Sequence, residues 1–152
     1  MHFEIQAVLL QLTRRVEIAL AIFSLLFFPG VLLHEASHFL TARLLGVRTG
    51  RFSVLPQVLA NGRVRMGYVE TEQTDLLRDA LIGTAPVLFG AAFVAYAGLT
   101  QLTLPAVWEA AIAGRAASVV GAVSAIADRP DFWLWMYLTL TVSSTMMPSA
   151  SD

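Results

Sequence analysis

The stretch GVLLHEASHFLTARLLG, residues 30–46, places two histidines and a glutamate inside a run that otherwise has the composition of a membrane-spanning helix. Positions i and i+4 lie on one face of a helix, so His34 and His38 point the same way and can bind one metal ion, with Glu35 beside them. Imidazole nitrogens suit zinc, and the adjacent carboxylate can take a proton from a water whose pKa the ion lowers. This HExxH spacing predicts a catalytic zinc centre with Glu35 as general base.

The alternative for these three side chains is hydrogen bonding between helices as polar packing groups. A carboxylate at the centre of a bilayer costs at least about 2.5 kcal/mol on insertion scales, and intramembrane ionisable residues mark functional sites by default. The cost therefore favours the metal site over polar packing.

The composition places the whole chain in a membrane. Its 152 residues are 57% hydrophobic and 14% charged, with a mean hydropathy of +0.67, too apolar for a soluble domain of this size. The formal net charge of −1 offers no basic surface for nucleic acid. There is no cysteine, which excludes disulfides and thiolate metal sites.

Three uncharged runs are near or above the length of a spanning helix, about 18 to 20 residues. They cover residues 18–33, 80–108 and 132–151. Pro29-Gly30 interrupts the first run, which predicts either one kinked helix or two short ones. We favour one helix, because the residues before Pro29 would span only about 20 Å of a core of roughly 30 Å.

The connection between the first two spans contains two strand-like segments on either side of Asn61-Gly62, a dipeptide suited to a hairpin turn. The predicted fold is an all-α membrane bundle of three core transmembrane helices with a small membrane-surface β-hairpin. It forms a single domain, residues 1–152. Its elements are a first helix at about 16–45, the hairpin at about 51–70, a second helix at about 80–104, a surface helix at about 106–127 and a third helix at about 132–152.

Charge in the connections predicts the orientation. Residues 46–79 hold five arginines against four acids, and residues 109–131 hold two against three. An excess of basic residues marks the cytoplasmic side, so we expect the hairpin and the active site to lie towards the cytoplasm. The Arg14-Arg15 pair argues weakly for the opposite orientation.

A catalytic zinc takes a third protein ligand and keeps a position open for water. His2, near the terminus, is the remaining histidine and is expected to be solvated, so the third ligand should be a carboxylate. Asp152 is the candidate, because the second and third uncharged runs hold no acid before it. At 1.5 Å per residue, His34 and Asp152 would lie about 27 and 30 Å along their helices, which places them at one depth.

These motifs resemble the site-2 protease family of intramembrane metalloproteases. The HEASH motif at residues 34–38 and the following FLTARLLGV are similar to the family's first helix. TMMPSASD at residues 145–152 is similar to its Asn-x-x-Pro element and following aspartate, with Thr145 where the family usually has Asn. GTAPVLFGA at residues 83–91 is similar to the Gly-Pro segment of the middle helix.

The resemblance implies one zinc ion per chain, bound by His34, His38 and Asp152, with Glu35 as the catalytic residue. It implies that the enzyme cuts transmembrane-helix substrates near the cytoplasmic face of a membrane, which we expect to be a prokaryotic cell membrane. The hairpin could offer an edge strand to an unwound substrate or only cover the helix ends, and the sequence leaves both open. An inactive metal-binding membrane scaffold is the alternative function. We also expect the natural chain to continue beyond Asp152.

Overall fold

The computed structural model is mainly helical and describes positions 8, 11, 14–54, 57–58, 64–65, 67–72 and 74–146. The helices are α2 (Val16–Leu44), α3 (Leu76–Tyr96), the short π-helical turn η1 (Ala97–Gln101), α4 (Leu104–Ile112), α5 (Ala116–Ala127) and α6 (Phe132–Thr145). The strands are β1 (Thr49–Ser53), β2 (Gln57–Val58), β3 (Val64–Arg65) and β4 (Tyr68–Thr71).

The first element is a single helix, α2, which passes through Pro29 without a break. α2 ends in a Schellman motif. The Gly46 N–H donates to the Arg43 carbonyl at 3.1 Å, and the Val47 N–H donates to the Ala42 carbonyl at 2.9 Å. Gly46 has φ +72°, a left-handed conformation that glycine adopts at little cost. This turn reverses the chain and directs it into β1.

Two helical stretches of the described residues are long and apolar enough to cross a membrane, Ala21–Leu44 and Leu76–Gln101. The predicted third span is represented by α6, whose 14 helical residues extend about 21 Å at 1.5 Å per residue. Residues 147–152, the rest of that predicted helix, lie outside the described residues. Two candidate spans agree with a membrane location, and the third core helix stays a prediction.

The single surface helix expected at about 106–127 is instead two helices, α4 and α5. Gly114 between them has φ +69°, and Arg115 is extended at φ −106° and ψ 104°. These two residues turn the chain sharply, so α4 and α5 pack against each other as a helical hairpin. The Ala-rich composition predicted helix correctly, but it did not indicate this break.

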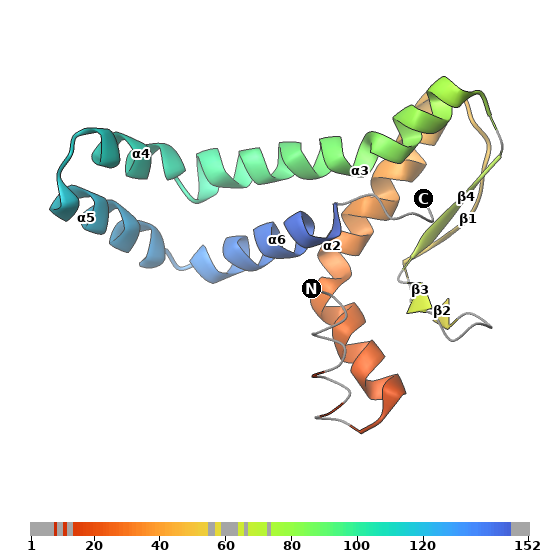
Figure 1. The fold of residues 1–152 in the computed structure, drawn as a ribbon, viewed down its shortest axis with the longest axis horizontal. Coiled ribbons are helices and arrows are strands. Elements are labelled where there is room, and N and C mark those ends of the chain that lie inside the picture. The colour runs from red at the N-terminus through yellow and green to blue at the C-terminus, as the bar shows by residue number, and fades with distance from the viewer. Residues whose placement is uncertain are drawn as a thin grey trace.

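The strands pair as a β-hairpin over the predicted region, starting at Thr49. β1 pairs antiparallel with β4, opposing Phe52 to Val69, and β2 pairs antiparallel with β3. The β1–β4 pair lies alongside the second half of α2 (Figure 1), where the ring centroids of Phe39 and Phe52 are 5.8 Å apart. Asn61-Gly62, the predicted turn, lies outside the described residues.

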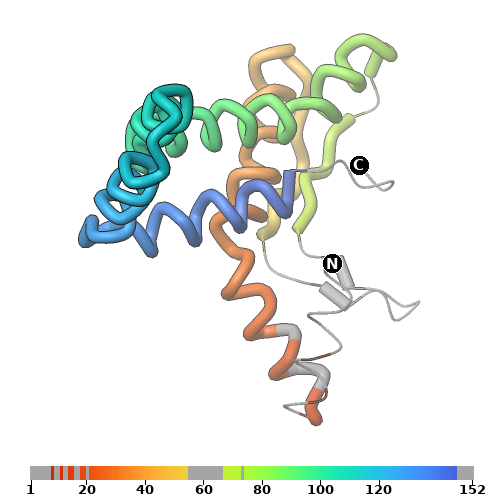
Figure 2. Tube along the Cα trace, turned by 60° about the vertical axis from the view of Figure 1, so that its left-hand side comes forward, coloured from red at the N-terminus to blue at the C-terminus, as the bar shows by residue number. Residues whose placement is uncertain are grey.

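The long helices cross rather than forming a parallel bundle. α3 passes the upper part of α2 and runs away from it, the α4–α5 hairpin reverses the chain, and α6 returns to α2 (Figures 1 and 2). The buried residues gather along α2, where one cluster contains Phe23, Phe27 and Val31. A second cluster joins Ala42 and Val47 to Ile82 of α3. The HExxH segment lies between these two clusters.

Candidate metal centre

The two histidines of the motif converge as the helical spacing predicts. The Nε2 atoms of His34 and His38 are 3.2 Å apart, and their ring centroids are 4.8 Å apart at an interplanar angle of 77°. His38 is buried, with 7% of its surface exposed. Each imidazole therefore directs its Nε2 atom at the same point in space.

Each imidazole is oriented by a backbone carbonyl from another helix. His34 Nδ1 lies 2.7 Å from the Thr145 carbonyl at the end of α6, and His38 Nδ1 lies 2.8 Å from the Ile82 carbonyl in α3. A carbonyl oxygen only accepts hydrogen bonds, so both Nδ1 atoms are assigned as donors. In the neutral rings, both Nε2 atoms then carry the lone pair.

This arrangement fits a zinc ion. Two lone pairs 3.2 Å apart repel each other unless a proton or a cation lies between them. Zinc–nitrogen bonds of 2.0–2.1 Å in a tetrahedral site place two ligand nitrogens about 3.3 Å apart. Ligand histidines typically donate their other ring N–H to a carbonyl or carboxylate, and the Thr145 and Ile82 carbonyls lie where they would accept such bonds.

Glu35 is buried beside the histidines, with 7% of its surface exposed. The backbone at Gly67, just before β4, covers it: a Cβ atom added at Gly67 would lie 2.8 Å from Glu35 Cγ and 2.9 Å from its Oε1. A side chain at position 67 would collide with the carboxylate. The hairpin therefore packs against the candidate general base, and not only against the helix ends.

The predicted third ligand, Asp152, lies outside the described residues. Among the residues that are described, no group of three His, Cys, Asp or Glu side chains is arranged to hold a metal ion. The structure thus brings together His34 and His38, with Glu35 next to them. The end of α6 reaches His34 through the Thr145 carbonyl, seven residues before Asp152.

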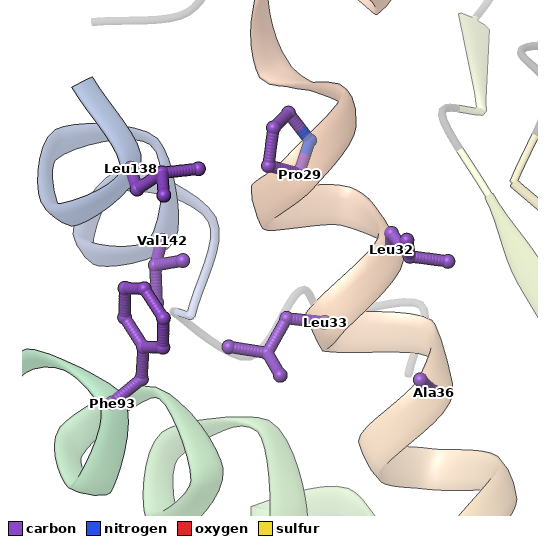
Figure 3. Close-up of a pocket in the computed structure, with 7 residues that line it drawn as sticks. All are labelled: Pro29, Leu32, Leu33, Ala36, Phe93, Leu138 and Val142. Carbon is purple, nitrogen blue, oxygen red and sulfur yellow. The ribbon is translucent and has the colours of Figure 1, made fainter. Parts of the chain in front are cut away.

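A second feature near the motif is an apolar pocket of about 270 Å³ between α2, α3 and α6 (Figure 3). Leu32 and Ala36 line it from α2, and each lies two positions from His34, on the opposite side of the helix. The pocket is lined by Pro29, Leu32, Leu33, Ala36, Phe93, Leu138 and Val142. These side chains are apolar, so the pocket holds no catalytic group.

Sequence reasoning missed three contributors to this centre: the carbonyls of Ile82 and Thr145, and the close approach of Gly67. A signal for Ile82 is present in the sequence, because Pro86 lies four residues later and has no N–H to offer that carbonyl. The contacts of Thr145 and Gly67 depend on tertiary packing and have no comparable local signal.

No protein-family model matches the chain, and no curated protein or solved structure matches it.

Proposed function

We propose that the chain is an intramembrane zinc metalloprotease of the site-2 protease type. The observation that supports this most directly is the convergence of the His34 and His38 Nε2 atoms at 3.2 Å, with both Nδ1 atoms on backbone carbonyls. The proposal assigns zinc binding to His34 and His38, with Asp152 as the third ligand. Glu35 is the proposed catalytic residue.

When bound, zinc supplies Lewis acidity that lowers the pKa of water and polarises a peptide carbonyl. Glu35 follows His34 directly in the sequence and is buried, and it would act as the general base towards water and then donate the proton to the leaving amine. Its burial excludes bulk solvent from the carboxylate. The carbonyls of Ile82 and Thr145 hold the imidazoles in the tautomer that leaves Nε2 unprotonated.

The two candidate membrane spans support a substrate that is itself embedded in the bilayer. We assign the substrate class as transmembrane helices, cut near the cytoplasmic face of a prokaryotic membrane. Peptide bonds inside a helix are shielded, so the substrate must unwind locally before cleavage. The hairpin lies directly over Glu35, so it must shift to admit the substrate backbone.

The same close cover of Glu35 favours the alternative function, an inactive metal-binding membrane scaffold. In that case the chain would bind zinc through the histidines, and the hairpin would keep substrate away from the carboxylate. A Glu35→Gln variant distinguishes the two functions, because it abolishes proteolysis in the first and leaves every function intact in the second.

The first test is the zinc content per chain of detergent-purified protein. We expect close to one zinc ion in the wild type and in His2→Ala, the matched histidine control, and a strong loss in His38→Ala and Asp152→Asn. Zinc retained in Asp152→Asn would reject the third ligand alone. A wild type without zinc under non-chelating conditions would reject the metal centre and the protease with it.

The second test is cleavage of a transmembrane-helix substrate in vesicles by the zinc-loaded protein. We expect activity in the wild type and none in Glu35→Gln, with an equal zinc content in both. Zinc binding without cleavage of a panel of such substrates would favour the scaffold.

A further inference from the structure

The interior of α3 contains a proline, Pro86, which interrupts the backbone hydrogen bonds of that helix. In an α-helix, the N–H of residue i+4 donates to the carbonyl of residue i. Proline has no N–H, so the Ile82 carbonyl lacks the donor that any other residue at position 86 would provide. A buried carbonyl without a donor is costly, which leaves Ile82 in need of a partner from outside the helix.

That partner is His38. Its Nδ1 lies 2.8 Å from the Ile82 carbonyl, and both residues are buried. The carbonyl that Pro86 releases is thus the one that orients the more deeply buried histidine of the candidate metal centre.

We infer that Pro86 is a positioning residue, which releases the Ile82 carbonyl to hold His38 in its Nδ1–H tautomer with the Nε2 lone pair directed at the metal position. The use of this tautomer for zinc binding rests on the proposed function, whereas the tautomer itself does not. Pro86 would act through Ile82 and His38 and would touch neither zinc nor substrate.

The other proline inside a long helix, Pro29 in α2, provides a matched comparison. It removes the donor to the carbonyl of Leu25, which is nine residues from the first histidine of the motif. If prolines acted only by bending helices, Pro29→Ala and Pro86→Ala would have similar effects. If Pro86 acts through the released carbonyl, only Pro86→Ala should change the His38 ring.

The experiment is ¹⁵N spectroscopy of histidine-labelled, metal-free protein in detergent at about pH 8.5, where an ordinary histidine with a pKa of about 6.5 is neutral. The His38 signals are assigned with His38→Ala. We expect the Nδ1–H tautomer in the wild type and in Pro29→Ala, and a substantial Nε2–H population in Pro86→Ala. The zinc affinity of Pro86→Ala should fall about 10- to 100-fold, the usual effect of losing an outer-shell partner.

A rescue variant separates the missing N–H from the proline ring. Replacing residue 86 by L-lactic acid, which forms an ester, also removes the N–H but has no ring. We expect this protein to regain the Nδ1–H tautomer and the zinc affinity that Pro86→Ala loses. Alanine is a better helix former than proline, so a purely structural role would not predict weaker zinc binding in a Pro86→Ala helix that is equally or more stable.

An Nε2–H tautomer of His38 in the wild type would overturn the inference, and so would a Pro86→Ala protein with unchanged tautomer and zinc affinity. A wild type that binds no zinc, yet shows the Nδ1–H tautomer and loses it in Pro86→Ala, would support the positioning role while rejecting the proposed function. The two proposals can therefore fail separately.

Discussion

The middle of α2 and the α4–α5 hairpin differ in what surrounds their side chains. Between Gly30 and Ala42, α2 meets α3, α6 and the β-hairpin, and its buried residues include Glu35, Ser37 and His38. α4 has no buried residue, and α5 buries only Ile126. The α4–α5 hairpin exposes large apolar side chains instead, including Trp108, which is 68% exposed.

The two regions therefore differ in how much of their surroundings the protein itself provides. Around the histidines, the protein itself supplies the close packing and the hydrogen-bond acceptors, so each polar group is fixed in one orientation. At the α4–α5 hairpin, large apolar side chains are left exposed instead, which agrees with a membrane location. We therefore expect substitutions near the motif to lower the free energy of unfolding, and substitutions in the α4–α5 hairpin to change it little.

The largest effect is expected from Gly30→Ala. An added Cβ would collide with the Thr141 carbonyl and the Thr145 hydroxyl, so α6 would have to move away from α2. We expect the free energy of unfolding to fall by about 1–3 kcal/mol, as for other overpacked sites. The matched control is Gly121→Ala in α5, where an added Cβ meets nothing within 4 Å and should stabilise the helix by about 0.5–1 kcal/mol. Denaturant titration in detergent micelles, followed by circular dichroism, measures both, and equal effects would contradict the comparison.

The next prediction concerns Gly67→Ala, which should disturb the β-hairpin and leave zinc binding by the two histidines unchanged. The new Cβ would approach Glu35 Cγ to 2.8 Å, so the hairpin or the carboxylate must shift. We expect faster hydrogen exchange in β4, unchanged zinc content and up to about a 100-fold loss of the proposed proteolysis, the cost that a misplacement of about 1 Å can have. Gly83→Ala in α3, with nothing within 4 Å of its added Cβ, is the control. Unchanged exchange in β4 would show that the hairpin does not rest on Glu35 in this way.

A smaller effect is expected from Tyr137→Phe, which removes a hydrogen bond between helices. The Tyr137 hydroxyl donates to the Leu26 carbonyl at 2.7 Å and links α6 to α2 three residues before Pro29. Hydrogen bonds between membrane helices contribute about 0.6 kcal/mol on average, so we expect a loss of about that size. Tyr96→Phe, which loses only a contact from Gln101 at the exposed end of α3, should cost less. The reverse order in denaturant titrations would contradict this prediction.

The smallest effect concerns Asp75, the N-cap of α3, which accepts a hydrogen bond from the Arg78 N–H at 3.4 Å. Desolvation raises the pKa of the Asp75 carboxyl, but the backbone N–H groups of Arg78 and Asp75, the Thr74 hydroxyl and the Arg78 charge lower it below its ordinary value overall. A lowered pKa in the folded state means that the ionised carboxyl stabilises the fold above the unfolded-state pKa. This contribution is lost as the pH falls through the folded-state value.

The measurement for Asp75 is the melting temperature of wild type and Asp75→Asn between about pH 7 and pH 2, because the carboxyl titrates near 3.9 in the unfolded chain. We expect the wild type to be slightly more stable at neutral pH and the difference to vanish at the acidic end. A difference that stays constant with pH would show that the charge of Asp75 contributes nothing to the cap.

The local features of the candidate site could be predicted from the sequence. The i, i+4 spacing of His34 and His38 predicted two rings on one face, and the structure brings their Nε2 atoms together. The uncharged runs located α2 and α3, because a helix long enough to span a bilayer leaves a direct compositional signal. Features set by neighbouring residues along one helix were therefore readable.

Features set by contacts between distant segments could not be predicted from the sequence. Nothing around Gly67 indicates that its backbone would lie against a glutamate 32 residues earlier. Helix propensity in the Ala-rich segment also could not show that Gly114 would adopt a left-handed conformation and divide it. The crossing of α2 by α3 and α6, likewise, depends on side-chain packing that periodicity does not encode.

The two unspecified positions of the HExxH pattern are not equivalent in this protein. Ala36 borders the apolar pocket, where the space beside it could take a larger side chain. Ser37 is fully buried, and its hydroxyl donates to the His34 carbonyl at 2.6 Å, one turn back along the helix. A pattern search that treats both positions as arbitrary would accept many chains that cannot pack in this way. In any set of functional variants of this chain, position 37 should be confined to the smallest residues, while position 36 varies in size.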